Sequence, residues 1–133
     1  MIYLLDTNTC IRFINGRVPP LRVKLLSVDQ DEIIVCSVIK AEMNSGAKKS
    51  QTPLVSLQKQ QQFFSAFRSL LFDDAAADYY STIRADLEQK GTPISHHDIQ
   101  IATNGLLHNL IVVTHNTREF SRISGLKLDD WEI

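Results

Sequence analysis

Three acidic residues could form a metal site if the fold brings them together: Asp6, Glu42 and Asp98. Carboxylates ~5 Å apart at an effective dielectric near 20 repel one another by roughly 3 kcal/mol per pair. Without a counter-ion, at least one of them would stay protonated. A divalent cation removes this conflict, and oxygen ligands without Cys or His favour Mg²⁺ or Mn²⁺ over zinc. Such a site can activate water and stabilise the charge that builds on a phosphodiester.

Each of these carboxylates also has a purely structural explanation. Asp6 could cap the helix that follows it, and Glu42 could lie on a solvated helix face. Two segments fit the capping-box pattern, Ser95-His-His-Asp98 and Asn116-Thr-Arg-Glu119. Spacing alone therefore leaves the function open.

The elements that must position the three carboxylates alternate between strands and helices. Apolar or β-branched runs predict strands over residues 2–5, 32–36, 70–72 and 110–114, with an edge strand over 127–131. Helices are predicted over residues 7–15, 19–28, 37–48, 54–70, 74–90, 96–108 and 116–120. This alternation predicts an α/β fold with a central parallel sheet of four to five strands. Asp6 follows the first strand directly, at the sheet edge where α/β proteins bind ligands.

Several residues indicate where helices begin, end or weaken. Ser37 and Asp74 are predicted N-caps. Gly16 and Gly91 are expected to end the helices before them. Gly105 lies inside a predicted helix, where a glycine costs about 1 kcal/mol relative to alanine.

The length of 133 residues predicts a single domain over residues 1–133. Hydrophobic residues make up 44% and charged residues 22%, as in soluble globular proteins. Apolar runs are too short for a membrane span, and Asp6 falls where a signal peptide would carry its apolar core. We therefore expect a cytoplasmic protein without membrane contact. Cys10 and Cys36, which have no CxxC spacing, are expected to be reduced, buried thiols.

The net charge of −1 argues against a general polyanion binder. Any contact with nucleic acid must therefore come from local basic patches. There are three candidate patches: Arg17, Arg22 and Lys24; Lys40 with Lys48 and Lys49; and Arg118 with Arg122. Solvated helix faces would have the same composition, so both explanations stay open.

Motifs spread along the chain support a more specific expectation. They are Leu5-Asp6-Thr7-Asn8, Ser37-Val-Ile-Lys-Ala-Glu42, Asp98-Ile-Gln-Ile-Ala and Val113-Thr-His-Asn-Thr-Arg-Glu-Phe120. In this order and at this length they resemble the PIN-domain ribonucleases, and within them the VapC toxins of bacterial toxin–antitoxin pairs. The resemblance implies a three-layer α/β/α domain whose first strand is flanked by the second and fourth. It also implies Mg²⁺- or Mn²⁺-dependent endonucleolytic cleavage of RNA, such as a transfer RNA. The implied assemblies are a homodimer and a hetero-oligomer with a VapB-like antitoxin.

The resemblance also implies roles for individual residues. Asp6, Glu42 and Asp98 would be the metal ligands, with Glu42 alternatively orienting or deprotonating the attacking water. Asn116 stands where many PIN domains place a fourth acidic residue. It adds no negative charge, so whether the site binds one metal ion or two stays open. The residues expected to support the ligands are Thr7, Asn8, Ser37, Thr114 and Glu119. The residues expected to hold RNA phosphates are Arg17, Arg22, Lys24, Lys48 and Lys49.

Three alternatives remain. The segment Asp6-Thr-Asn8-Thr-Cys10 also resembles the DxDx(T/V) opening of haloacid-dehalogenase-type phosphatases, in which Asp6 would be a nucleophile. Asn8 replaces the second aspartate of that motif, and the chain is short for that fold. A second alternative is a catalytically weakened PIN-fold protein that acts mainly through antitoxin binding. A third is a DNA-cleaving nuclease, because both nucleic acids offer the same phosphodiester and no RNA-reading module is visible.

Overall fold

A computed structural model describes residues 1–133 of the chain. The strands are β1 (Tyr3–Leu5), β2 (Ile33–Cys36), β3 (Arg68–Leu70), β4 (Ile111–Val113) and β5 (Lys127–Asp129). The helices are α1 (Thr7–Asn15), α2 (Pro19–Ser27), α3 (Ser37–Lys48), α4 (Pro53–Phe64), α5 (Asp74–Gln89), α6 (His96–Leu107) and α7 (Thr117–Phe120), with a 3₁₀ turn, η1 (Gln30–Glu32). No helix has the length and apolar character that a membrane span requires.

The five strands form one parallel sheet in the order β3-β2-β1-β4-β5. β1 pairs with β2 and β4, which confirms the predicted neighbours of the first strand. Every residue of β1 is buried, as expected for a central strand of a sheet covered on both faces. Since all strands run in one direction, their carboxyl ends lie at one edge, where Asp6 follows β1.

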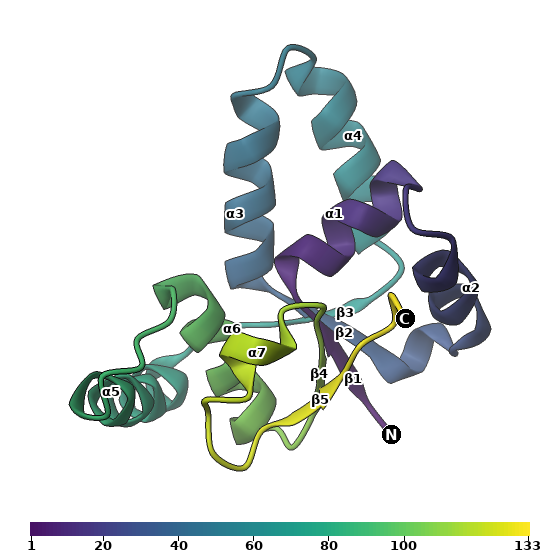
Figure 1. The fold of residues 1–133 in the computed structure, drawn as a ribbon. Helices are drawn as coiled ribbons and strands as arrows, with labels where there is room; N and C mark the ends of the chain where they lie inside the picture. The colour runs from purple at the N-terminus through teal and green to yellow at the C-terminus, as the bar shows by residue number, and fades with distance from the viewer.

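Helices cover the sheet on both sides (Figure 1). In this view α5 and α6 lie to the left of the strands, and α1 and α2 lie above and to the right. α3 and α4 form a long helical hairpin that rises from the sheet. The strands and the inner helix faces share a core cluster of 26 buried residues. The predicted α/β/α architecture is therefore confirmed.

The region between α4 and β3 differs from the sequence prediction. α4 ends at Phe64 rather than near residue 70, and β3 occupies Arg68–Leu70 rather than residues 70–72. Phe67 lies beyond the end of α4 but still packs edge-to-face on Phe63, with ring centroids 5.1 Å apart. The helical spacing of the aromatic residues was therefore misleading. β3 is an edge strand in which Arg68 is exposed. Hydrophobicity therefore did not predict where this strand lies.

Two predicted N-caps were wrong by one residue. The N-cap of α3 is Cys36 instead of Ser37, and that of α5 is Asp73, whose carboxylate accepts the backbone N–H of Ala76 at 2.9 Å. Gly16 ends α1 in the left-handed region, at φ 67°, as predicted. A residue with a Cβ is strained in that region, which explains the glycine there.

Gly105 has a packing role that the sequence did not suggest. A Cβ at this position of α6 would lie 2.7 Å from Cγ2 of Val112 in β4. Because real Cβ atoms do not approach so closely, the glycine is what allows α6 to lie directly on the sheet. Helix propensity alone gave no indication of this packing role.

Candidate active site

The three predicted carboxylates come from the end of a strand and from two helices. Asp6 is the residue after β1, Glu42 lies in the second turn of α3, and Asp98 lies in the first turn of α6. Asp6 is only 3% exposed and also caps α1, since its Oδ1 accepts the backbone N–H of Thr9 at 2.9 Å. The structural role considered for Asp6 is thus real. It fixes the carboxylate at the carboxyl edge of the sheet.

The electrostatics indicate that these carboxylates share one site. Burial raises the pKa of Asp98 to about 6, and the charges of Asp6, Glu42 and Glu119 add to the shift, against an opposing contribution from the Ser95 hydroxyl. Burial likewise raises the pKa of Asp6, while the Thr9 and Thr114 hydroxyls oppose the shift. We call Asp6, Glu42, Asp98 and Glu119 the acidic edge.

Glu42 is held from two sides. The Thr7 hydroxyl donates to Oε1 of Glu42 at 2.8 Å, which ties the start of α1 to α3. On the other side, Nδ1 of His97 lies 3.5 Å from Oε2. Thr7 therefore supports a candidate ligand, as expected, and His97 is a further neighbour of Glu42.

Asn116 and Glu119 do not form the capping box that their spacing suggested. No side-chain bond caps α7; instead the Asn116 amide donates to Oε2 of Glu119 at 3.0 Å. The backbone N–H of Asn116 donates to Oγ1 of Thr114 at 2.9 Å. Asn116 thus positions the fourth carboxylate of the acidic edge, at the place where a fourth acid was expected.

Other predicted site residues lie elsewhere. The Ser37 hydroxyl donates to the backbone carbonyl of Leu70 in β3, so its bond supports the sheet. Asn8 is exposed at the start of α1. Lys48 and Lys49 lie at the far end of α3, about 16 Å along the helix from its start.

The remaining basic candidates surround the α1–α2 connection. Arg17 follows α1 directly and is exposed, as are Arg22 and Lys24 on α2. The Arg22 guanidinium lies 5.8 Å from the ring centroid of Phe13. A role for these residues in binding RNA stays a prediction.

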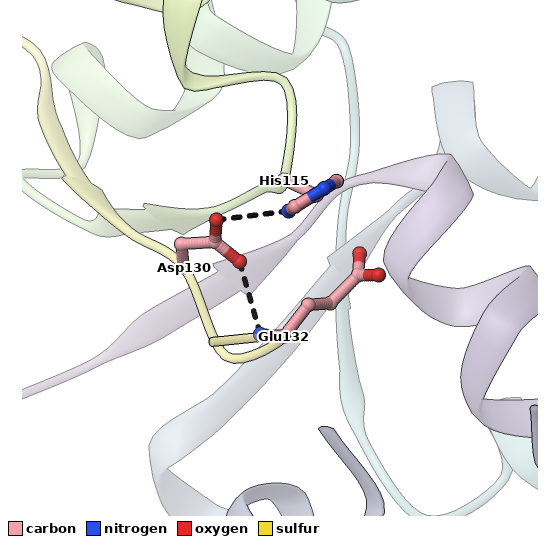
Figure 2. A group of neighbouring side chains, drawn as sticks. All are labelled: His115, Asp130 and Glu132. Atoms are coloured by element: carbon pink, nitrogen blue, oxygen red, sulfur yellow. Dashed lines mark hydrogen bonds and ion pairs between the residues drawn. The ribbon is translucent and has the colours of Figure 1, made fainter. Parts of the chain in front are cut away.

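A second group of polar residues beside the acidic edge was not predicted. Figure 2 shows His115, which follows β4, together with Asp130 and Glu132 from the segment after β5. Nδ1 of His115 lies 2.9 Å from Oδ2 of Asp130, and Nη1 of Arg12 donates to Oε2 of Glu132 at 2.7 Å. Sequence offered no signal for these contacts, because Arg12 and Glu132 are 120 residues apart.

The acidic edge has the ligand chemistry of a site for a hard divalent cation, but three ligand atoms lie within 4.8 Å of one another only at His115, Asp130 and Glu132. Its four carboxylates supply only oxygen ligands, the kind that Mg²⁺ and Mn²⁺ prefer. No lysine or arginine forms an ion pair with any of them. Burial is the main cause of the raised pKa of Asp98, and the negative charges of the other three carboxylates add to it. A bound cation would neutralise those charges. Asp6, Glu42 and Asp98 are the residues that could hold the ion.

Comparisons with known proteins identify the family of the chain. The PIN domain family model matches residues 3–126. The tRNA(fMet)-specific endonuclease VapC of Shigella flexneri is 38% identical over 129 residues, covering 97% of both chains.

Two solved structures have the same fold over nearly their whole length. One is DNA-bound VapBC from Salmonella typhimurium, with a TM-score of 0.92, 36% identity and 98% coverage of both chains. The other is VapBC2 from Rickettsia felis bound to a promoter DNA fragment, with a TM-score of 0.91 and 33% identity over 98% of this chain and 99% of that one. These matches decide against the phosphatase alternative. From its sequence, its fold and its acidic edge, the chain belongs to the PIN-domain family and, within it, to the VapC-type proteins.

Proposed function

We propose that this protein is a metal-dependent endoribonuclease and the toxin of a toxin–antitoxin pair, acting on RNA in the cytoplasm. The observation that carries the proposal is the acidic edge, where burial and the charges of Asp6, Glu42 and Glu119 raise the pKa of Asp98 to about 6. Such a group of like charges costs free energy unless it binds a cation. A metal site that cleaves phosphodiesters would explain why these carboxylates lie together.

We assign separate roles to the residues of the acidic edge. Asp6 and Asp98 would hold Mg²⁺ or Mn²⁺ through their carboxylates. The ion, when bound, supplies Lewis-acid stabilisation of the charge that develops on the scissile phosphate. The Thr7 hydroxyl binds Oε1 of Glu42. Oε2, which lies 3.5 Å from Nδ1 of His97, would face either the ion or the attacking water, from which it can accept the proton. Asn116 keeps Glu119 in place through its amide.

The substrate and partner in this proposal come from the relatives. Relatives of this chain are described as a tRNA(fMet)-specific endonuclease and as ribonucleases, which favours RNA, and a transfer RNA in particular. The solved relatives are VapBC assemblies, so we propose a VapB-like antitoxin as the partner. We also propose a homodimer, which sedimentation of the antitoxin-free protein would establish.

The proposal is tested with purified, antitoxin-free protein incubated with total cellular RNA, or with single-stranded or duplex DNA, in Mg²⁺, Mn²⁺ or EDTA. We expect discrete RNA fragments with either metal and intact RNA in EDTA. Because water is the proposed nucleophile, the ribose 2′-hydroxyl takes no part, and the fragments should carry no 2′,3′-cyclic phosphate. Sequencing the fragment ends identifies the RNA and the bond.

Other results would select one of the alternatives. Cleavage of DNA with RNA left intact would identify a DNA nuclease. Intact RNA and DNA in every condition, from protein shown to be folded, would favour the weakened nuclease that acts through its antitoxin. Asn116→Asp would then show whether the missing carboxylate is the cause.

A further inference from the structure

A polar pocket adjoins the acidic edge and is not used by the chemistry described above. Asn8, Arg12, His115 and Asn116 line a cavity of about 250 Å³ that contains no apolar residue. Asn116 belongs to both places, since it also bonds Glu119 of the acidic edge. The pocket and the acidic edge are therefore neighbours, joined at Asn116.

Two donors of this pocket are held by carboxylates of the C-terminal segment. Oε2 of Glu132 accepts from Arg12 at 2.7 Å, and Oδ2 of Asp130 lies 2.9 Å from Nδ1 of His115. Figure 2 shows that Asp130 also accepts the backbone N–H of Glu132, at 2.9 Å, which fixes the turn between them. Both side chains are thus pre-positioned, while 40% of Arg12 and 51% of His115 stay exposed.

These contacts argue against a second metal site here. Single ligand atoms of His115, Asp130 and Glu132 lie within 4.8 Å of one another. However, the two carboxylates are already engaged by Arg12 and by the imidazole, and a cation would have to compete with both. Their arrangement is better explained as support for Arg12 and His115.

The free polar atoms of the pocket match a sugar–phosphate unit. A carboxylate only accepts, so Nδ1 of His115 donates to Asp130 and Nε2 is left free for a ligand. Arg12 keeps further N–H donors after its bond to Glu132. A free imidazole nitrogen beside a guanidinium suits a ribose 2′-hydroxyl next to a phosphate, because that hydroxyl can both donate and accept a hydrogen bond. The 2′-hydroxyl is also the group that distinguishes RNA from DNA.

We propose that this pocket binds the ribose and phosphate of the nucleotide next to the scissile bond. In this arrangement Nε2 of His115 forms a hydrogen bond with the 2′-hydroxyl, and Arg12 binds the phosphate. Both are positioning residues, and Asp130 and Glu132 hold them. The inference rests on the proposed ribonuclease function, because it assigns the pocket to that enzyme's substrate.

The test measures binding rather than cleavage, in EDTA, by fluorescence anisotropy with a labelled ten-nucleotide RNA and its all-2′-deoxy copy. Wild-type protein should prefer the RNA by about 3- to 10-fold, the range expected for one net hydrogen bond. His115→Ala should bind RNA more weakly and DNA unchanged, so that the preference disappears. Arg12→Ala should weaken both equally. His108→Ala, at the far end of α6, and Arg84→Ala, on α5, are the matched controls.

Folding and function are separated within the same experiment. Arg12→Ala leaves Glu132 without its partner, so Arg12→Ala combined with Glu132→Gln removes that charge as well, and thermal melts verify that each variant folds. A wild-type protein without a preference for RNA, or a preference that survives in His115→Ala, would overturn the inference. Failure of the proposed function is seen separately, as RNA left intact by wild-type protein in Mg²⁺.

Discussion

At the residue scale, the carboxylates of the acidic edge lie together without a lysine or arginine to offset them. The pKa of Asp98 is raised to about 6 by burial and by its acidic neighbours, so without metal this carboxyl group is protonated at mildly acid pH. Ionising it in the folded protein costs stability. Selection for stability alone would not retain an ionised carboxylate that destabilises the fold. A bound cation would offset this loss of stability.

The first prediction concerns the pH dependence of stability without metal. Because the folded pKa of Asp98 lies above the ordinary value of 3.8, its stabilising contribution is complete below pH 4 and is lost as the pH rises through about 6. The shift corresponds to about 3 kcal/mol, which solvent screening of this half-exposed group reduces to about 1 kcal/mol. We expect the free energy of unfolding of wild-type protein, relative to Asp98→Asn, to fall by that amount between pH 4 and pH 7.

Urea denaturation in EDTA at several pH values measures this difference. Adding Mn²⁺ at pH 7 should restore the stability of wild-type protein and leave Asp98→Asn unchanged. Parallel pH profiles for the two proteins in EDTA would contradict the assignment of a raised pKa to Asp98.

The second prediction concerns the hydroxyl that holds Glu42. Thr7→Val keeps the shape of the side chain but removes the 2.8 Å bond to Oε1. Loss of such a supporting contact commonly costs about 10- to 100-fold in metal affinity. We expect a tenfold or greater loss of Mn²⁺ affinity by calorimetry, with a stability change of about 1 kcal/mol. Thr82→Val, on the surface of α5, is the control, and equal affinities for the two variants would refute the role of Thr7.

The sequence predicted the positions of residues that belong to a local motif, such as a strand end or a helix cap, better than contacts between distant segments. The positions of Asp6, after a strand, and of Asp98, in a first helical turn, are as predicted, because strand ends and helix caps have local signals in the sequence. Their roles as metal ligands stay predictions. His115, Asp130 and Glu132 were missed, because only the fold brings the C-terminal segment to the end of β4 and to α1. Contacts between distant segments leave no spacing to recognise.

At the element scale, α6 is the helix whose position matters most, since it carries Asp98 and packs against β4. Gly105 permits that close packing, because a Cβ there would lie 2.7 Å from Val112 and 3.3 Å from Leu126. Helix propensity alone would favour alanine at this position. Packing overrides propensity here.

The third prediction follows from this conflict. Gly105→Ala should destabilise the protein by about 1–3 kcal/mol through overpacking, although alanine is the better helix former. Gly46→Ala is the matched control, because Gly46 also lies within a helix but has nothing within 4 Å of its added Cβ. That change should stabilise the protein by up to about 1 kcal/mol. Thermal denaturation compares them, and stabilisation by both alanines would contradict the packing argument.

Element boundaries were predictable where an apolar run coincides with a buried strand. β1, β2 and β4 are nearly or fully buried and lie within their predicted ranges. The edge strand β3 was misplaced, because Arg68 and Ser69 are exposed and the apolar Leu71 after it is 72% exposed. At a sheet edge, hydrophobicity no longer marks the strand.

At the scale of the whole molecule, the charge distribution must let a protein of net charge −1 bind RNA. Lys48 and Lys49 lie at the far end of α3, away from the carboxylates of the acidic edge. Such separation lets one region bind phosphates while the other holds metal. The neighbours of the first strand in the sheet could not be predicted from the spacing of residues; only the family resemblance implied them.

The fourth prediction tests this basic end of α3. Each phosphate contact on a single strand contributes about −0.7 to the slope of log affinity against log salt concentration. Replacing both Lys48 and Lys49 by alanine should therefore make the slope for RNA binding shallower by about 1.4. Lys90→Ala is the control, since Lys90 pairs with Asp86 on α5. A slope that the double variant leaves unchanged would exclude these lysines from RNA binding.

The most direct test of the whole account is the single-turnover rate of RNA cleavage in Mn²⁺ for Asp6→Asn, Glu42→Gln and Asp98→Asn. Asp78→Asn, an exposed residue of α5, is the control. If the acidic edge is one metal-dependent site, each of the three substitutions lowers the rate by about 100-fold or more, and EDTA abolishes cleavage by wild-type protein. The control should cleave like wild-type protein. Cleavage that persists in EDTA, or in Asp6→Asn and Asp98→Asn, would contradict the account.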